Sequence, residues 1–331
     1  MLCVTVEYGP ECGITVADAR HGVKRKDSGR FGGEGRVWDA KGMVRIVRWF
    51  LLMLVVLLVG FFVYQTIAVR GAFSRNLPAS DAPGTAVVVG TKGHQSIGRM
   101  FVVGVVDPTS PLVVLLHGDA PFRNPRYQNF TAADVAKAVP GTRVVALLRP
   151  GYADPFGERS DGDRGYASGD NYTPEDVDHV ASAVWQLKKQ YGVKTVVLAG
   201  HSGGAAMTAN VTALYPGLVQ QAVLVACPCD LPSFREHMWQ TQHSPLWLLP
   251  VKSLSPMETL EKMKPGATIT AISGASDPIA PPQDVVRYVA KATGEGIAAS
   301  VLLLPGKDHE IFEEPSVIGA IVQAVKSAEA K

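Results

Sequence analysis

Short, continuous apolar runs alternate with longer helical patterns along the chain after residue 110. The runs are rich in Val, Leu and Ile, as strands are when both faces of a sheet are covered. They lie at 111–118, 143–151, 194–200, 221–227, 267–274 and 299–306. Helices are predicted between and after them, at about 131–139, 173–192, 203–216, 282–293 and 315–328. Strands that alternate with helices require right-handed crossovers, so the pattern predicts an α/β fold with a mostly parallel sheet and helices on both faces.

Two further features complete this domain. Earlier strands are predicted at 86–90 and 99–106, with a turn at 93–98 between them. A long interval at about 228–266 separates two of the later strands by more than a plain helix needs. It contains several large apolar residues, namely Phe234, Met238, Trp239, Leu246 and Trp247. We expect a cap-like insertion here, although an ordinary helix with a packed surface loop fits equally well.

One apolar segment lies outside this pattern. Residues 49–69 carry no formal charge and are long enough to cross a bilayer as a helix. Five Lys or Arg residues occur in 29–48, against two in 70–90. By the positive-inside bias, the N-terminus is expected in the cytoplasm and the later domain outside it, in the periplasm or extracellular space. A cleaved signal peptide is the alternative, but the run exceeds a usual signal core and no clean cleavage site follows it.

These patterns predict the domain organisation. Residues 1–42 have no sustained period and are expected to be an unstructured head. We hypothesise that translation begins at Met43, which would leave this head untranslated. Residues 43–70 are then a transmembrane signal anchor, 71–84 a linker and 85–331 the α/β domain.

Composition narrows the choice of partners and cofactors. The net charge of +2 gives no reason to expect a nucleic-acid partner. The four cysteines do not form a disulfide framework; Cys227 and Cys229 flank one proline, and a bond across one residue would be strained. We therefore expect two thiols at a strand end, and no metal or other cofactor. Oligomeric state does not follow from the sequence.

The candidate chemistry begins at the pattern Gly200-His201-Ser202-Gly203-Gly204. A G-x-S-x-G sequence between a strand and a helix is typical of a nucleophile elbow, in which the serine stands out from a tight turn. The small glycines allow strand and helix to approach closely. Ser202 is thus the candidate nucleophile.

A serine hydroxyl needs a base and a group that orients the base. His309 follows the last predicted strand, and Asp277 follows the strand before it. Because the carboxyl ends of parallel strands meet at one edge of a sheet, we expect Ser202, Asp277 and His309 to form a catalytic triad. Asp230 is the alternative acid.

The strand that ends at "LLHGDA" is expected to supply the oxyanion hole. The backbone N–H groups of Asp119 and Gly203 are the candidate donors. A carboxylate at 119 would oppose a developing oxyanion unless it points away or pairs with Arg123 or Arg149. Five residues are candidates for the substrate pocket: His117, Gly118, Arg149, Tyr152 and Trp239.

Together the motifs "LLHGD", "RPGY", "GHSGG", "GASDPIAPP" and "GKDHEIF" make residues 85–331 resemble the α/β-hydrolase fold family, in its serine branch. The resemblance implies an eight-stranded, mostly parallel sheet with Ser202 as nucleophile and a cap after the sixth strand. It also implies a loop at Arg149–Tyr152 that borders the pocket.

The expected function is hydrolysis of a small-molecule carboxylic ester through an acyl-enzyme intermediate. The same triad would also serve an amidase, a peptidase or an acyltransferase. A non-catalytic binding protein on this fold is the alternative from another class.

Overall fold

The computed structural model describes residues 40–72, 84–120, 124–154, 156–165 and 169–330. The chain divides into two compact units, residues 1–63 and 64–331. The head predicted at 1–42 and the linker predicted at 71–84 lie almost entirely outside the described residues.

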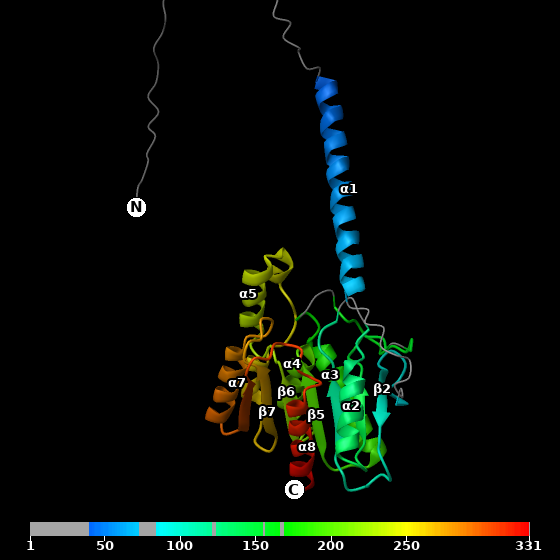
Figure 1. Cartoon of the computed structure of the whole chain (residues 1–331), viewed down its shortest axis with the longest axis vertical. Helices are drawn as coiled ribbons and strands as arrows, with labels where there is room; N and C mark the ends of the chain where they lie inside the picture. Colours follow the sequence, from blue (N-terminus) through cyan, green and yellow to red (C-terminus); the bar gives the residue numbers. More distant parts are fainter. Residues whose placement is uncertain (1–39, 73–83, 121–123, 155, 166–168, 331) are drawn as a thin grey trace, which may run out of the picture. The chain divides into compact units, whose positions relative to one another are not determined.

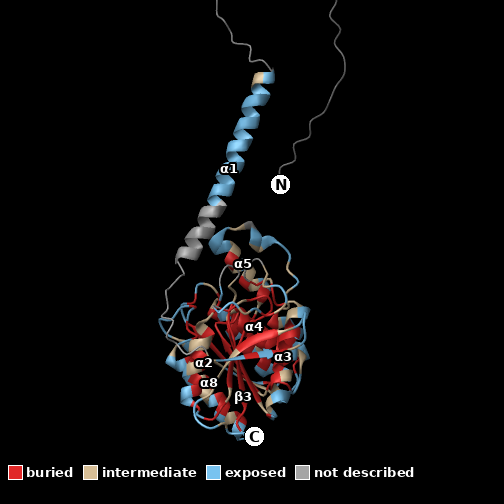
Figure 2. Cartoon of the chain, turned by 90° about the vertical axis from the view of Figure 1, so that its right-hand side faces the viewer, coloured by how far each residue is buried: buried red, intermediate tan, exposed pale blue. Residues whose placement is uncertain are grey.

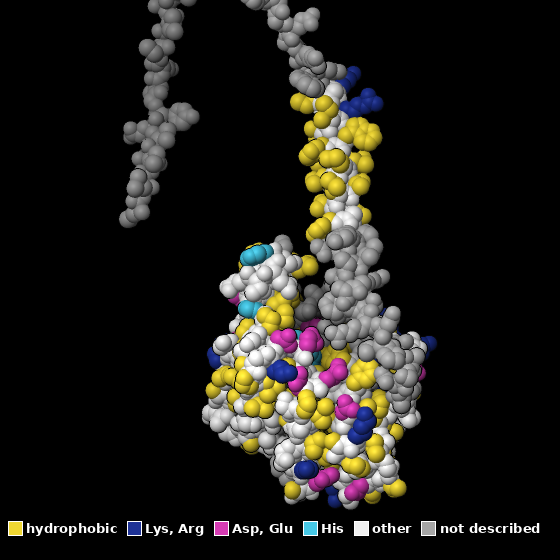
Figure 3. Space-filling view, in the orientation of Figure 1, with side chains coloured by type: hydrophobic (Ala, Val, Ile, Leu, Met, Phe, Trp, Pro, Cys, Tyr) yellow, Lys and Arg dark blue, Asp and Glu magenta, His cyan; other side chains and the backbone are white. Residues whose placement is uncertain are grey.

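A single long helix, α1 (Ala40–Ala72), precedes the sheet. Its segment Lys41–Phe61 is long and apolar enough to cross a membrane and is not buried by other parts of the protein. Figure 3 shows hydrophobic side chains along the visible face of this segment and basic ones near its start. The described part of the chain therefore contains one candidate membrane span, which overlaps the predicted segment 49–69 but begins eight residues before it.

The second unit is built on one eight-stranded sheet with strand order β1-β2-β4-β3-β5-β6-β7-β8. The first two pairs in this order, β1–β2 and β2–β4, are antiparallel, and all later pairs are parallel. The strands are β1 (Thr85–Val89), β2 (Ser96–Phe101), β3 (Leu112–Leu116), β4 (Val144–Leu147), β5 (Val196–His201), β6 (Gln221–Val225), β7 (Thr268–Gly274) and β8 (Ala298–Leu304). The predicted α/β class with a mostly parallel sheet is confirmed.

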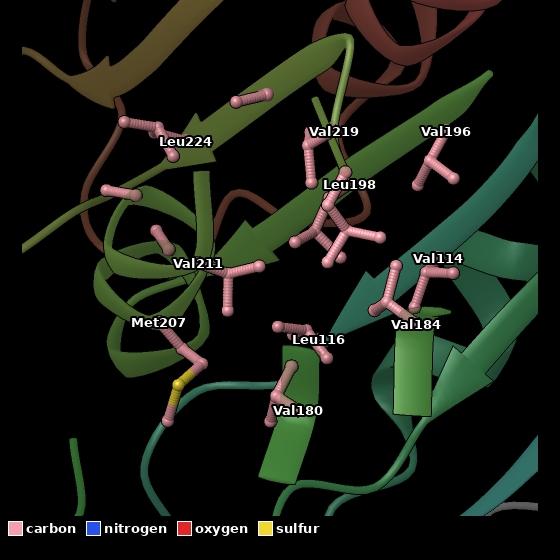
Figure 4. Close-up of a cluster of buried hydrophobic side chains, with 14 of the residues drawn as sticks. Val114, Leu116, Val180, Val184, Val196, Leu198, Met207, Val211, Val219 and Leu224 are labelled. Carbon is pink, nitrogen blue, oxygen red and sulfur yellow. The ribbon is translucent and has the colours of Figure 1, made fainter. Parts of the chain in front are cut away.

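Helices cover both faces of this sheet (Figure 1). α3 (Pro174–Tyr191), α4 (Gly203–Leu214) and α7 (Pro282–Gly294) pack on one face, while α2 (Tyr127–Ala138) and α8 (Pro315–Glu329) pack on the other. Neighbouring residues of β3 show why its sequence is apolar throughout: Val114 faces α3 and α4, and Leu115 faces α2 and α8. Figure 2 shows the buried residues concentrated between the two helical layers, and Figure 4 shows the core beneath α3 and α4.

Local signals fix the ends of the elements. Thr173 caps α3 through a reciprocal capping box with Asp176, and Gly192 ends the helix in the left-handed region.

The prediction for the first strands was only partly right. β2 begins at Ser96, inside the predicted turn, and it ends at Phe101 because Gly104, at φ +79°, lies in a bend of the following apolar run.

The insertion between β6 and β7 is helical. It contains α5 (Leu231–Gln242), η1 (Pro245–Leu248), α6 (Pro256–Thr259) and η2 (Leu260–Lys262). α5 lies beyond the carboxyl ends of the strands (Figure 1). Phe234 and Met238 on α5 are buried against Tyr172 and Ala206, and Trp247 packs against this cluster. The insertion thus covers the edge of the sheet from which Ser202 projects.

The expectation of two free thiols was wrong, because Cys227 and Cys229 form a disulfide. Their Cα atoms lie 5.1 Å apart, within the range that a disulfide spans. Ala226 makes this possible, since its φ of +49° bends the chain directly after β6. The Cys229 carbonyl also accepts a hydrogen bond from the Met257 N–H, at 2.8 Å. The pair therefore fixes the start of the insertion.

Candidate active site

Ser202 occupies a strained turn between β5 and α4. Its φ of 52° and ψ of −121° are unusual for a residue with a side chain. Glycine is required on both sides: a Cβ atom on Gly200 would lie 2.1 Å from the Gly204 carbonyl oxygen, and one on Gly204 would lie 2.4 Å from that of His117. This is the geometry expected of a nucleophile elbow.

The structure brings Ser202, His309 and Asp277 together from three different strand ends. His309 Nε2 lies 2.9 Å from Ser202 Oγ, and His309 Nδ1 lies 2.8 Å from Asp277 Oδ2. Because a carboxylate only accepts hydrogen bonds, Nδ1 carries the proton and Nε2 is free to accept the serine hydroxyl proton. All three residues therefore have the mutual geometry that base-assisted nucleophilic attack requires.

Both carboxylate oxygens of Asp277 accept hydrogen bonds, and His309 donates one of them. The backbone N–H groups of Ile279 and Ala280 donate to Asp277 Oδ1, at 2.8 and 2.9 Å. Asp277 and His309 are almost fully buried, whereas Ser202 is partly exposed. Asp230, the alternative acid, lies elsewhere: it caps α5 and pairs with Arg287 at 3.4 Å.

Two backbone donors stand beside Ser202. Within the described part of the chain, the N–H groups of Asp119 and Gly203 have no hydrogen-bond acceptor. Gly203 is the first residue of α4, so its N–H also belongs to the positive end of that helix. Both predicted donors thus lack an acceptor within the described residues, as groups that bind an oxyanion must.

The carboxylate of Asp119 is neutralised by a buried network. Its Oδ1 pairs with Arg149 Nη1 at 2.7 Å, and its Oδ2 accepts from the Gly169 N–H and the Tyr172 hydroxyl. Burial opposes the charge of Arg149, but Asp119, Tyr152 and Tyr172 together offset this and raise the pKa of the guanidinium. This pairing with Arg149 answers the objection that a carboxylate at 119 would oppose an oxyanion.

A second network joins residues 117–120, which we call the oxyanion loop after the donor predicted there, to His309. His201 Nε2 donates to the His309 carbonyl oxygen at 2.9 Å, so its Nδ1 accepts from the Tyr127 hydroxyl, also at 2.9 Å. The Tyr127 oxygen in turn accepts from the Gly118 N–H. Burial, with the neighbouring His309, lowers the pKa of His201 to about 3, so this ring is neutral and the hydrogen-bond directions are fixed.

Sequence reasoning missed most of this network. It identified His201 only as a member of the elbow motif and did not consider Tyr127 at all. Tyr127 begins α2 and lies 74 positions from His201 in the sequence, so no local pattern links them.

Three pocket candidates are placed differently from the expectation. His117, Arg149 and Tyr152 are fully buried and therefore do not line an open pocket. His117 Nε2 accepts the Arg149 backbone N–H at 3.1 Å, and the Tyr152 hydroxyl accepts the Ala120 N–H at 3.1 Å. Burial, together with the Arg149 charge, lowers the pKa of His117 to about 3. Through these hydrogen bonds, the buried side chains hold the backbone next to Asp119 in place.

The remaining candidates differ among themselves. Gly118 lies against the nucleophile, since a Cβ atom added to it would be 2.9 Å from Ser202 Cβ. Trp239 is half-buried on α5 and contacts His243, outside the buried cluster formed by Phe234 and Met238. Arg123, the other proposed partner of Asp119, lies outside the described residues.

Other parts of the described surface carry no comparable chemistry. A groove of about 1040 Å³ lies between α3 and the end of α4, beside Trp185 and Tyr215, and no member of the triad lines it. Among the described residues, no group of three or more His, Cys, Asp or Glu side chains is arranged to hold a metal ion.

Comparisons with known proteins agree with this fold. The model of the Alpha/beta hydrolase family matches residues 113–271. A search of curated proteins finds no match. The chain resembles the crystal structure of esterase PE8, with a TM-score of 0.51 and 18% identity over 70% of this chain and 98% of that one.

Two other solved structures are similar to a comparable extent. Est1E from Butyrivibrio proteoclasticus, with ferulic acid bound, has a TM-score of 0.56 and 14% identity over 74% of this chain and all of its own. Proline iminopeptidase from Mycobacterium smegmatis has a TM-score of 0.54 and 14% identity over 74% of this chain and 99% of its own. With this fold, this elbow and the match over residues 113–271, the protein has the α/β-hydrolase fold and is similar to the Alpha/beta hydrolase family, as its motifs had indicated.

Proposed function

We propose that this protein is a membrane-anchored serine hydrolase that cleaves carboxylic esters. The observation that carries the proposal is the contact of His309 with both Ser202 Oγ and Asp277 Oδ2, at 2.9 and 2.8 Å. Similarity to this family supports a hydrolase, and the esterases among the similar structures favour an ester substrate.

The reaction proceeds in two halves. Ser202 Oγ attacks the ester carbonyl carbon while His309 Nε2 takes the hydroxyl proton, and the N–H groups of Asp119 and Gly203 bind the resulting oxyanion. His309 then gives its proton to the leaving alcohol, which departs and leaves Ser202 acylated. Water, deprotonated by the same nitrogen, attacks the acyl group and releases the acid. Asp277 holds the imidazole and stabilises its charged form.

The location of the domain forms the second part of the proposal. The segment Lys41–Phe61 anchors the chain, and the basic residues before it keep the N-terminus in the cytoplasm. The catalytic domain then lies outside the cytoplasm. The disulfide between Cys227 and Cys229 supports this orientation, because disulfides persist mainly in oxidising compartments.

A substrate panel tests the proposed reaction. The full chain in detergent is assayed with p-nitrophenyl esters of graded acyl length and with matched aryl amides. We expect ester turnover that Ser202→Ala lowers by about 10³-fold or more. Ser182→Ala serves as the control, because Ser182 is an exposed serine on α3, and it should retain full activity.

The other outcomes are equally informative. Faster cleavage of the amides would favour an amidase or peptidase that uses the same triad. A folded protein without turnover of either series would favour a non-catalytic binding protein.

A further inference from the structure

The end of the insertion presents three large apolar side chains to solvent. Leu246, Leu248 and Leu249 are 56%, 60% and 56% exposed, in and directly after η1. We call residues 246–249 the leucine tip. Clustered exposed leucines are unusual on a soluble surface and mark contact with a partner or a membrane.

Hydrogen bonds from Arg235 on α5 hold the backbone of the leucine tip in place. Arg235 Nη2 donates to the carbonyl oxygens of Leu246, Trp247 and Leu249, at 3.1, 2.9 and 2.7 Å. The guanidinium also lies over the Trp247 ring, and the indole N–H donates to Gln242 Oε1 at 2.9 Å. Trp247 therefore points inward, toward Phe234, while the leucines on either side of it point outward.

These contacts suit the tip to an apolar environment. A carbonyl group that leaves water without a hydrogen-bond partner carries a large free-energy cost. Arg235 supplies that partner to three of the four carbonyls of the tip before any contact is made. These three carbonyls therefore keep a hydrogen-bond partner when the leucine side chains leave water.

We propose that the leucine tip docks into the surface of the same bilayer that anchors the chain. This inference rests on the proposed membrane anchor and is independent of the proposed reaction. The short connection between the membrane helix and the domain favours the bilayer as the surface that the tip contacts. α1 continues to Ala72, about 16 Å beyond Phe61, and residues 73–84 can span at most about 40 Å. A domain of this size is about 45 Å across, so rotation of the tethered domain can bring the leucine tip to the bilayer.

Docking of this kind needs only weak intrinsic affinity. A tethered site experiences a high effective concentration of its target, on the order of millimolar for short connections. Three leucines provide apolar area without a charged side chain among residues 246–249. We expect loss of two of them to lower the ratio of docked to undocked protein by about 10-fold to 100-fold.

Docking would also orient the candidate active site. His237 Nε2 on α5 donates to the Pro278 carbonyl oxygen at 2.8 Å, next to Asp277. Ile279 packs against the same buried cluster as Phe234. Because the insertion is attached to the loop of the triad acid, docking turns the carboxyl edge of the sheet toward the bilayer.

Depth-dependent fluorescence quenching tests this proposal. The full chain, with Cys3→Ser and Cys12→Ser, carries Leu248→Cys labelled with an environment-sensitive fluorophore without reductant. It is reconstituted in phosphatidylcholine vesicles that contain lipids with spin-labelled acyl chains. The matched control is a label at Leu302→Cys, since Leu302 is 47% exposed on the edge strand β8.

We expect the label at 248 to be quenched at least about twofold more than the label at 302. Leu246→Ser with Leu249→Ser should bring the quenching at 248 down to the control level. Equal quenching at the two sites would overturn the proposal. So would an emission shift at 248 that depends on protein concentration without quenching, since this would assign the tip to a second copy of the chain. Labelling of Ser202 by a fluorophosphonate in the same sample reports separately on the proposed reaction.

Discussion

The substitution Tyr127→Phe tests the network that joins the oxyanion loop to His309, the proposed base. It removes one hydroxyl and keeps the ring, which packs edge-on against His201 and Phe312 at centroid distances of 5.4 and 5.8 Å. Burial raises the pKa of Tyr127, so the hydroxyl is neutral and donates at every working pH. The variant therefore loses two hydrogen bonds and little packing.

The expected magnitude follows from the two groups left behind. The Gly118 N–H and the His201 Nδ1 atom would both lose their partner in a buried site, at about 1–3 kcal/mol each. We expect the free energy of unfolding to fall by about 2–6 kcal/mol, and the melting temperature by about 5–20 °C. Because Gly118 precedes the donor residue Asp119, kcat should fall by about 10-fold to 100-fold, less than the loss of a whole oxyanion donor.

Thermal unfolding of the full chain in detergent and p-nitrophenyl ester kinetics provide the two readouts. Tyr288→Phe is the matched control, because Tyr288 is also fully buried but its hydroxyl has no hydrogen-bond partner in the described structure. Its removal should leave stability and kcat unchanged. If Tyr127→Phe behaves like Tyr288→Phe in both assays, the network does not position the loop.

Three further predictions concern the buried polar groups. His117 and His201 have pKa values lowered to about 3, so the unfolded chain takes up protons below pH 6.5 that the folded chain does not. Stability should therefore fall by about 2–3 kcal/mol from pH 7 to pH 5.5, and a denaturation midpoint that stays constant would refute this. Arg149→Met leaves the Asp119 carboxylate buried without its ion pair and should lower the free energy of unfolding by about 3–5 kcal/mol in chemical denaturation; an unchanged midpoint would argue against the pairing. Asp277→Asn should lower kcat by about 10⁴-fold, because the amide can favour the wrong histidine tautomer, and a loss below about tenfold would exclude Asp277 as the orienting acid.

Much of the fold follows from local sequence. The parallel strands are marked by continuous apolar runs because both faces of the sheet are buried, and glycines or prolines mark where the elements end. The juxtaposition of Ser202, Asp277 and His309 also follows, since strand order and polarity bring the ends of β5, β7 and β8 to one edge.

The features that local sequence does not predict depend on the folded backbone and on contacts between distant parts of the chain. The pocket candidates His117 and Arg149 were expected at the surface of the site, but tertiary contacts bury them completely. The disulfide between Cys227 and Cys229 was missed because it depends on the backbone bend at Ala226, which no residue pattern indicates for alanine.

We propose that Ser202 is a nucleophile activated by His309, and each step of the proposed reaction depends on this activation. The most direct measurement is mass spectrometry of peptides after treatment of the full, folded chain with a fluorophosphonate, beside His309→Ala. We predict one phosphonyl adduct, located on Ser202, that forms at least about 10³-fold more slowly in the variant. A folded protein that forms no adduct on Ser202, or that forms it equally fast without His309, would contradict the claim.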